Sequence, residues 1–278
     1  MCQFSLKRYL ELIKMARDAG YDFIDFDQVS GVRQKSFGDE KTTSLAAANG
    51  EVEPGMAAKC LLRHDVDGDL AAAVRMAEKE AELGISATYF LMWRSPCYNL
   101  MSRANQNYAE LILSLGHKVG LHYDQGFDEI NKKSRKETSA AINQQVNWIG
   151  DLLDCEIKAV SFHQPNASIL QAAIDCGPYI NTYDKEKLSA FEYLSDSNRR
   201  FPLWESLPVA GKISCEAALA SMYPRNIQLL IHPMWWVYED RSTEEVWNQV
   251  LLSNFERMET QLLETERAFG KKRAFKIE

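Results

Sequence analysis

Short apolar runs alternate with stretches of helical spacing from residue 59 onward, and this alternation restricts the fold more than any other feature of the chain. The runs have the length and pattern of strands, while the stretches between them, such as 137–153, place apolar residues on one helical face. Strands that alternate with helices form a mainly parallel sheet, either a β/α barrel or a doubly wound sheet. The clearest predicted strands are CLLRHDV (60–66), SATYFLM (86–92), HKVGLHY (117–123), IKAVSFH (157–163) and NIQLLIH (226–232).

The N-terminal part of the chain precedes this alternation. Residues 6–20 have helical spacing, and YDFIDFDQV (21–29) alternates as a strand does. Residues 31–58 are small and polar and have no period, which predicts a flexible insertion, either a surface loop or a lid.

The C-terminal part is less regular. Further strands are predicted around YINTYD (179–184) and FEYLSD (191–196). Ser242 and Glu245 have the spacing of a capping box that opens a helix over residues 242–270. Because the sequence has no repeat and no linker after the 31–58 stretch, we expect residues 1–278 to form a single domain.

Charge and composition exclude several classes of protein. The chain of 278 residues has a formal net charge of −7, whereas a nucleic-acid groove needs clustered Lys and Arg. No apolar run approaches the ~20 residues that span a bilayer, and charges interrupt the N-terminus where a signal peptide needs an apolar stretch. The six cysteines are dispersed without a CxxC pair, which is typical of reduced thiols. We therefore expect a soluble, cytoplasmic protein with no nucleic-acid partner and no membrane span, and the oligomeric state stays open.

Four predicted strands end in side chains that can bind a metal ion. Because the carboxyl ends of parallel strands meet at one edge of the sheet, we expect these side chains to lie together. Carboxylates and imidazoles suit zinc, iron, cobalt or nickel better than calcium or magnesium. The histidine at a strand start, His117, is instead expected to be structural. The strand-end residues are His64, Asp65, Asp67, His122, Asp124, His163 and His232.

Such a set of residues predicts hydrolysis by a metal-activated water. A second carboxylate then serves as the general base, and a separate histidine serves as the general acid. The sequence has no GxSxG or comparable cysteine motif, so nucleophilic catalysis is not indicated. It also has no GxxxxGK[ST] and no GxGxxG, so no nucleotide cofactor is indicated.

Five segments resemble those of a known family. The order of the segments is that of polysaccharide deacetylases with the NodB-homology domain, and they are most similar to a divergent branch of it. The resemblance covers residues 59–236 and implies a distorted β/α barrel with a divalent metal, often zinc, that assists hydrolysis of an N-acetyl or related amide. The segments are LLRHDVDGD (61–69), GHKVGLHYD (116–124), SFHQPN (161–166), YLSDSN (193–198) and LLIHPMWW (229–236).

The resemblance also implies roles for individual residues. RHDVDG stands where the family has TFDDG, so Asp65 is assigned as the base and Asp67 as a metal ligand, with the reverse assignment open. His122 takes the place of the first metal histidine in GHKVGLHYDQG, and His232 that of the acid histidine. A later aspartate motif of the family resembles the region of Asp196.

The chain departs from the family pattern at three positions. Val66 separates the two aspartates, which are adjacent in the family, Gly126 occupies the place of the second metal histidine, and His163 stands where an arginine is usual. Since glycine has no side-chain ligand, a third ligand has to come from His163 or Asp124, and we assign His163. Residues expected to contact substrate or to support the site are His64, Asp124, Asp196, Trp235 and Trp236, the tryptophans either stacking on a sugar ring or packing in the core.

These observations together predict a metal-dependent hydrolase, namely a deacetylase of an N-acetylated sugar or glycan precursor. Zinc is favoured as the cofactor, with iron, cobalt and nickel as alternatives. The expected partner is a small-molecule or glycan-precursor substrate. Two other functions remain open: a catalytically inactive barrel that binds a glycan or a protein partner, and a metal-dependent amidase that acts on a non-sugar metabolite.

Overall fold

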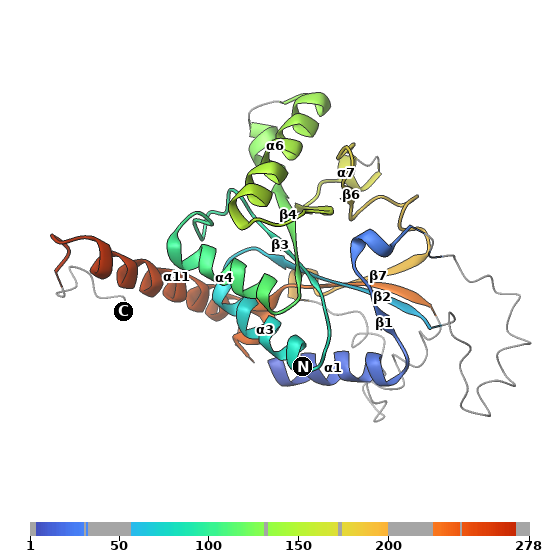
Figure 1. Ribbon diagram of the computed structural model, residues 1–278, viewed down its shortest axis with the longest axis horizontal. Helices are drawn as coiled ribbons and strands as arrows, with labels where there is room; N and C mark the ends of the chain where they lie inside the picture. Colours follow the sequence, from blue (N-terminus) through green and yellow to red (C-terminus); the bar gives the residue numbers. More distant parts are fainter. Residues whose placement is uncertain are drawn as a thin grey trace, which may run out of the picture.

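The computed structural model describes residues 4–30, 32, 57–130, 133–171, 174–199, 225–239 and 241–270. The predicted insertion over 31–58 lies outside the described residues, apart from 32, 57 and 58. Figure 1 shows a parallel sheet with helices packed against it.

The described strands form one sheet of eight strands, in the order β6-β5-β4-β3-β2-β8-β7, with β1 paired to the start of β2. Every pair is parallel, as the alternation in the sequence predicts. The strands are β1 (Asp22–Phe23), β2 (Lys59–Val66), β3 (Thr88–Leu91), β4 (Lys118–Asp124), β5 (Ala159–His163), β6 (Ile180–Asn181), β7 (Phe191–Ser195) and β8 (Asn226–Ile231).

The sheet curls into a half-barrel, so that its two edges approach each other. Tyr183 follows edge strand β6 and Tyr193 lies in edge strand β7, yet their ring centroids are 6.3 Å apart. Arg63 of the central strand β2 lies 4.9 Å and 5.9 Å from the centroids of these two rings. Gln228 of β8 donates a hydrogen bond of 3.1 Å to the carbonyl oxygen of Thr182. The expected barrel-like fold is therefore present, as an open, curled sheet.

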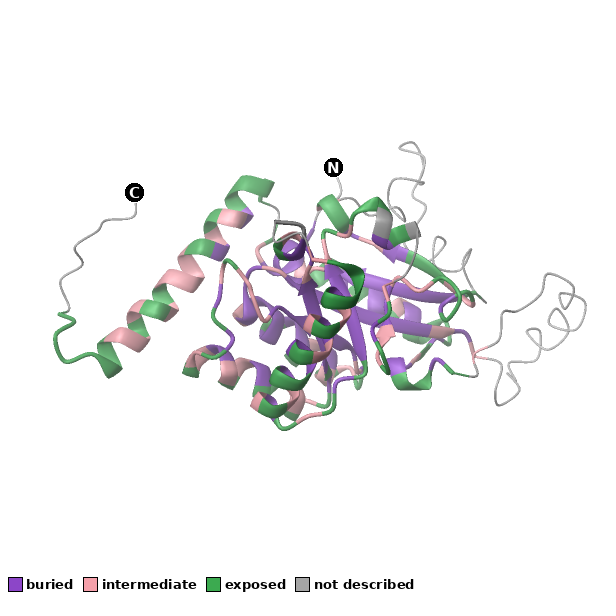
Figure 2. Ribbon diagram, turned by 90° about the horizontal axis from the view of Figure 1, so that it is seen from above, coloured by how far each residue is buried: buried purple, intermediate pink, exposed green. Residues whose placement is uncertain are grey.

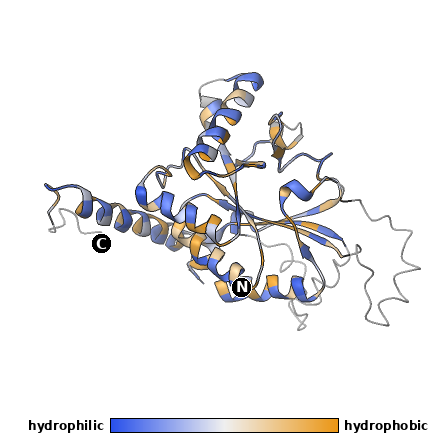
Figure 3. Cartoon of the chain, viewed as in Figure 1, coloured by the Kyte–Doolittle hydropathy of each residue, from blue (hydrophilic) through white to orange (hydrophobic). Residues whose placement is uncertain are grey.

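Helices cover the outer face of this half-barrel. Figures 2 and 3 show buried strands and apolar inner faces of the surrounding helices. As predicted, Asp69 caps α3 by accepting a hydrogen bond of 2.9 Å from the backbone amide of Ala71, and a capping box opens α11 at Ser242. The longer helices are α1 (Leu6–Asp18), α3 (Leu70–Glu82), α4 (Arg103–Ser114), α6 (Arg135–Leu153) and α11 (Thr243–Thr265).

Shorter helices follow several strands and complete the fold. They are η1 (Phe26–Gln28), α5 (Gly126–Ile130), α7 (Ala167–Gln171), η2 (Ser197–Arg199) and α10 (Pro233–Val237). In the described part of the chain, no helix has both the length and the apolar character that a membrane span requires.

The strand predicted over 21–29 is wrong beyond Phe23. The backbone amide of Asp25 donates a hydrogen bond of 2.9 Å to Oε1 of Gln28, and residues 26–28 form the helix η1 instead. A local hydrogen bond between side chain and backbone thus replaces strand pairing, which the alternating pattern alone does not reveal.

Successive side chains along each strand point to opposite faces of the sheet, so the buried side chains form two layers. The larger core lies between the sheet and the helices and includes Leu62, Tyr89 and Phe162. A smaller cluster, which includes Leu61 and Phe90, fills the concave interior. Because residue i+2 on a strand lies on the same face as residue i, Asp65 faces the interior with Leu61, whereas His64 faces the helices with Leu62.

Candidate metal and proton-transfer site

Three strand-end side chains converge at the mouth of the half-barrel. Nε2 of His122 lies 3.1 Å from Oδ1 of Asp67, and Nδ1 of His163 lies 3.4 Å from the same oxygen. One ligand atom from each residue falls within 4.8 Å of the others. The side chains of Asp67 and His163 are 16% and 23% exposed, so a ligand can reach them from solvent. One carboxylate and two imidazoles form the donor set that suits a divalent metal such as zinc.

The electrostatics of these three residues favour a charged carboxylate. Burial raises the pKa of Asp67, but hydrogen bonds from His122 and His163 outweigh it and hold this pKa well below its usual range. Burial likewise lowers the pKa of His163, but the hydrogen bond to Asp67 outweighs it and the net shift is upward. The site therefore holds a carboxylate that stays ionised between two imidazoles, and that charge is available to a cation.

Asp65 lies deeper in the interior and is 2% exposed. Its Oδ2 accepts hydrogen bonds from Nη2 of Arg63 at 3.0 Å and from Oγ of Ser161 at 2.9 Å. The same Oγ lies 3.0 Å from Nδ1 of His122. Oδ1 of Asp65 has no hydrogen-bond partner among the described residues. One oxygen is thus fixed by the protein, and the other is buried without a partner among the described residues.

His232 is held on the other side of the mouth by Asp196. Nδ1 of His232 lies 2.5 Å from Oδ1 of Asp196, and Oδ2 accepts hydrogen bonds from the His232 amide at 2.9 Å and from Nε1 of Trp236 at 2.7 Å. Burial lowers the pKa of His232, but the carboxylate of Asp196 outweighs it and raises this pKa to about 9. Nε2 of His232 points toward Asp67, 3.8 Å from its Oδ2.

The structure thus brings together most of the residues that the sequence selects. A partly exposed set of possible metal ligands (Asp67, His122 and His163) lies next to His232, a histidine that stays protonated at neutral pH. The residues brought together are Asp65, Asp67, His122, His163, Asp196 and His232.

His64 is not part of this group. It points to the outer face of β2, where its ring is buried and Nε2 lies 2.8 Å from Oε1 of Glu80 in α3. The expectation that His64 contacts substrate or supports the site is corrected, because adjacent residues of a strand face opposite sides of the sheet. His117 belongs to the same buried cluster on the outer face, where Nε2 contacts the carbonyl oxygen of Ala77 at 2.9 Å.

Asp124 also lies outside the set of ligand atoms. Its Oδ1 accepts a hydrogen bond of 3.0 Å from the backbone amide of Gly126 and so closes the turn that follows β4. A Cβ atom at Gly126 would lie 3.2 Å from the same oxygen. Of the two candidates for a third ligand, the geometry therefore places His163, and not Asp124, beside Asp67 and His122.

Neither tryptophan that follows His232 offers a face to a sugar. Trp236 is fully buried and donates its indole hydrogen bond to Asp196. Trp235 is 7% exposed, and its ring meets Trp247 edge-on with centroids 6.1 Å apart. The expected stacking of these rings on substrate is corrected, and the alternative of core packing describes both residues.

Two residues of the site escaped the sequence analysis. Arg63 and Ser161 lie inside quoted motifs but received no role. The signal that could have identified them is strand periodicity, since Arg63 precedes Asp65 by two residues and Ser161 precedes His163 by two. Polar residues at inward positions next to a predicted site need hydrogen-bond partners, and Arg63 and Ser161 both donate to Asp65.

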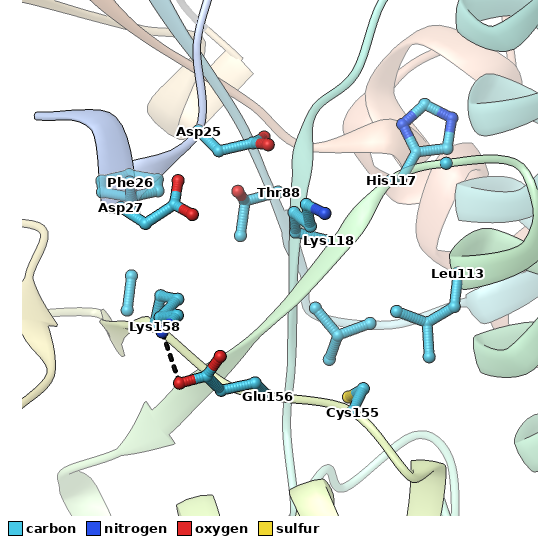
Figure 4. Close-up of a pocket in the computed structure, with 13 residues that line it drawn as sticks. Asp25, Phe26, Asp27, Thr88, Leu113, His117, Lys118, Cys155, Glu156 and Lys158 are labelled. Atoms are coloured by element: carbon cyan, nitrogen blue, oxygen red, sulfur yellow. Dashed lines mark hydrogen bonds and ion pairs between the residues drawn. The ribbon is translucent and has the colours of Figure 1, made fainter.

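A separate cavity of about 290 Å³ lies at the opposite end of the strands (Figure 4). It is lined by both acidic and basic side chains, including Asp25 and Lys118, and Lys158 forms an ion pair with Glu156 at its edge. None of its lining residues belongs to the strand-end site.

Comparisons with known proteins give similar structures only at low identity. No protein-family model matches the sequence, and neither does any curated protein. The Xyl-CE4 domain of a multidomain xylanase from the hindgut metagenome of Trinervitermes trinervoides is 12% identical over 74% of this chain and 84% of that chain, with a TM-score of 0.40.

Two further solved structures are similar at the same level. A family 4 carbohydrate esterase from Bacillus anthracis is 12% identical over 81% of this chain and 90% of that chain, with a TM-score of 0.41. The chitin deacetylase from the fungal pathogen Colletotrichum lindemuthianum is 13% identical over 71% and 81%, with a TM-score of 0.39. Because these scores are low, the site is assigned from the contacts of this chain alone.

Proposed function

We propose that the protein is a metal-dependent hydrolase that removes the acetyl group from an N-acetylated sugar or glycan precursor. The observation that supports this proposal is the convergence of Asp67, His122 and His163 beside a protonated His232. A ligand set next to a proton donor is the arrangement that amide hydrolysis requires.

The metal is assigned to Asp67, Nε2 of His122 and Nδ1 of His163, with zinc favoured over iron, cobalt and nickel. A divalent cation at this position supplies Lewis-acid polarisation of the amide carbonyl. The fit rests on the donor set itself, since the three ligand atoms lie within 4.8 Å of one another and the carboxylate is ionised.

Asp65 is assigned as the general base. The contacts favour this assignment over the reverse one, because Asp67 contacts both imidazoles whereas Asp65 keeps Oδ1 without a partner. Arg63 and Ser161 hold Oδ2, so the carboxylate cannot rotate freely. Oδ1 is assigned as the atom that takes the proton of the attacking water.

His232 is assigned as the general acid. With a pKa of about 9 it carries a proton at neutral pH, and Nε2 faces the space in front of Asp67. The amide nitrogen that leaves needs a proton as the carbon–nitrogen bond breaks, and His232 can donate it. Asp196 stabilises the charged ring before this transfer and orients it.

The test is acetate release from a panel of N-acetylated sugars and sugar nucleotides by zinc-loaded protein. We expect turnover by the wild type and a loss of about 10²- to 10⁴-fold in Asp65→Asn. The matched control is Asp124→Asn, because asparagine can still accept the hydrogen bond from Gly126 and this residue lies outside the ligand set. Equal activity of the wild type and Asp65→Asn would contradict the role of Asp65.

Glycine at position 126 favours an alternative, a catalytically inactive barrel without a metal. A barrel that had lost its metal would bind a glycan or a protein partner without turnover. The enzyme is supported over the inactive barrel by the position of His163, whose ligand atom lies within 4.8 Å of those of Asp67 and His122. Including N-acyl compounds without a sugar in the same panel also separates a sugar deacetylase from an amidase that acts on another metabolite.

A further inference from the structure

Ser161 joins the two halves of the proposed site, although nothing in its motif assigns it a role. It lies on β5 with its side chain in the interior and is fully buried. Its hydroxyl oxygen is 2.9 Å from Oδ2 of Asp65 and 3.0 Å from Nδ1 of His122. One hydroxyl group therefore contacts both the assigned base and an assigned metal ligand.

The direction of these two hydrogen bonds follows from the number of protons. A serine hydroxyl has one hydrogen to donate and can also accept. The carboxylate of Asp65, which also accepts from Arg63, can only accept while it is charged. Ser161 therefore donates its hydrogen to Asp65, and its oxygen accepts a hydrogen bond from Nδ1 of His122.

This direction determines which nitrogen of His122 keeps its proton when a cation binds. Nε2 is the nitrogen that hydrogen-bonds Asp67 at 3.1 Å in the metal-free protein, so it is the nitrogen whose proton a cation would displace while Nδ1 keeps its own. A metal ligand has to present a lone pair, so this is the tautomer that can bind a cation.

Ser161 is the group that accepts the hydrogen bond from Nδ1 of His122. Oδ2 of Asp65 is 3.7 Å from Nδ1 of His122, which is too far for a direct hydrogen bond. With an alanine at position 161, Nδ1 would lose its acceptor, and the proton of the neutral ring would shift to Nε2, where Asp67 can accept it. The same substitution would remove one of the two donors that hold Oδ2 of Asp65.

We propose that Ser161 is a positioning residue that fixes the Nδ1–H tautomer of His122 for metal binding and orients the carboxylate of Asp65. This inference rests on the proposed function, since it gives a task to the same site. It assigns no contact between Ser161 and the substrate or the metal.

The first test is a zinc titration of three proteins against a chromophoric chelator. We expect Ser161→Ala to bind zinc about 10- to 100-fold more weakly than the wild type, as is typical when the hydrogen-bond partner of a histidine ligand is removed. Ser161→Thr keeps the hydroxyl and is expected to restore affinity near the wild-type value. Zinc affinity in Ser161→Ala equal to that of the wild type would overturn the inference.

The second test does not depend on metal or turnover. Long-range ¹H–¹⁵N NMR spectra distinguish protonated from unprotonated ring nitrogens, and the His122 signals are assigned by their loss in His122→Gln. We expect Nδ1 to carry a proton at pH 8 in the metal-free and the zinc-loaded wild type. An unprotonated Nδ1 in either state would overturn the inference.

The two tests separate failure of this inference from failure of the proposed function. A wild type that binds no zinc contradicts the proposed function, and the spectra of the metal-free protein then decide the position of the His122 proton. A wild type that binds zinc with Nδ1 unprotonated contradicts the role of Ser161 alone. Circular dichroism of each variant confirms that weaker binding does not come from unfolding.

Discussion

Two groups of histidines and carboxylates lie on opposite faces of the same sheet. Each contains two imidazoles and one acid, and each is built partly from β2 or the residues that follow it. The inner group is partly exposed at the strand ends, whereas the outer group is completely buried beneath α1 and α3. The inner group is Asp67, His122 and His163, and the outer group is Glu80, His64 and His117.

Hydrogen bonds within the protein hold the polar atoms of the outer group, apart from Nδ1 of His64, which has no partner among the described residues. Both carboxylate oxygens of Glu80 accept hydrogen bonds from tyrosines, one from Tyr9 and the other, at 2.9 Å, from Tyr89. Nδ1 of His117 accepts a hydrogen bond of 3.2 Å from the backbone amide of Ala87. Burial lowers the pKa of His117, which keeps its ring neutral.

The inner group bonds within itself and is open to solvent. Oδ1 of Asp67 faces both imidazoles, and the side chains of His163 and His232 reach solvent. The difference shows that residue type does not separate a metal site from a structural cluster. Exposure to solvent does, and it depends on which face of the strand a residue occupies.

Breaking the outer group should therefore affect the fold, and this is the largest effect that we expect. In Glu80→Gln the ionised acceptor of the Tyr9 and Tyr89 hydroxyls is lost in a fully buried site, so the free energy of unfolding should fall by about 3–5 kcal/mol. Urea denaturation measures this change. Zinc affinity of the folded protein should stay at the wild-type value, and a loss of zinc binding without a loss of stability would reverse the roles of the two groups.

Breaking the inner group should affect the metal and spare the fold. Asp67→Asn removes the charge of the ligand set, and we expect zinc affinity to fall by more than about 100-fold, because changes outside the ligand set already cost about 10- to 100-fold. Competition with a chelator measures the affinity, and urea denaturation of the metal-free protein provides the control. Unchanged zinc binding in this variant would show that the cluster is not a metal site.

The pair of His232 and Asp196 predicts how the stability and the turnover of the protein depend on pH. The raised pKa means that the protonated pair adds stability fully below pH 6.5 and loses it as the pH rises through about 9. Turnover should decline over the same alkaline range as the acid loses its proton. In Asp196→Asn the pKa of His232 should fall toward 6.5, which an NMR titration of the metal-free protein measures. A pKa that stays near 9 would contradict the assigned cause.

The smallest effect is expected at Trp235, which packs on Trp247 and does not face the mouth. Trp235→Phe should cost about 1–2 kcal/mol of stability through lost packing, and the KM for an acetylated sugar should not change. Thermal unfolding and steady-state kinetics measure the two quantities. A large rise in KM with unchanged stability would restore the idea that this ring stacks on substrate.

Much of the fold could be predicted because its signals are local. The parallel strands and the caps at Asp69 and Ser242 follow from periodicity and spacing within a few residues. The curl of the sheet could not be predicted in this way, because it depends on contacts between Arg63 of β2 and tyrosines at both edges.

The same reasoning explains which site residues were predicted. Strand ends brought His122, His163 and His232 into one group. The wrong expectation for His64 arose because position along a strand was used without its facing direction. The stacking expected of the tryptophans failed for another reason, since Trp236 supports the site instead through a hydrogen bond to Asp196, 40 positions away.

The central claim is that His163 completes a metal site in a chain with glycine at position 126. Elemental analysis of zinc-reconstituted protein tests it directly, with wild type, His163→Ala and Asp124→Asn measured side by side. The account predicts about one zinc per chain in the wild type and in Asp124→Asn, and a large loss in His163→Ala. Zinc retained in His163→Ala but lost in Asp124→Asn, or absent from all three, would contradict it.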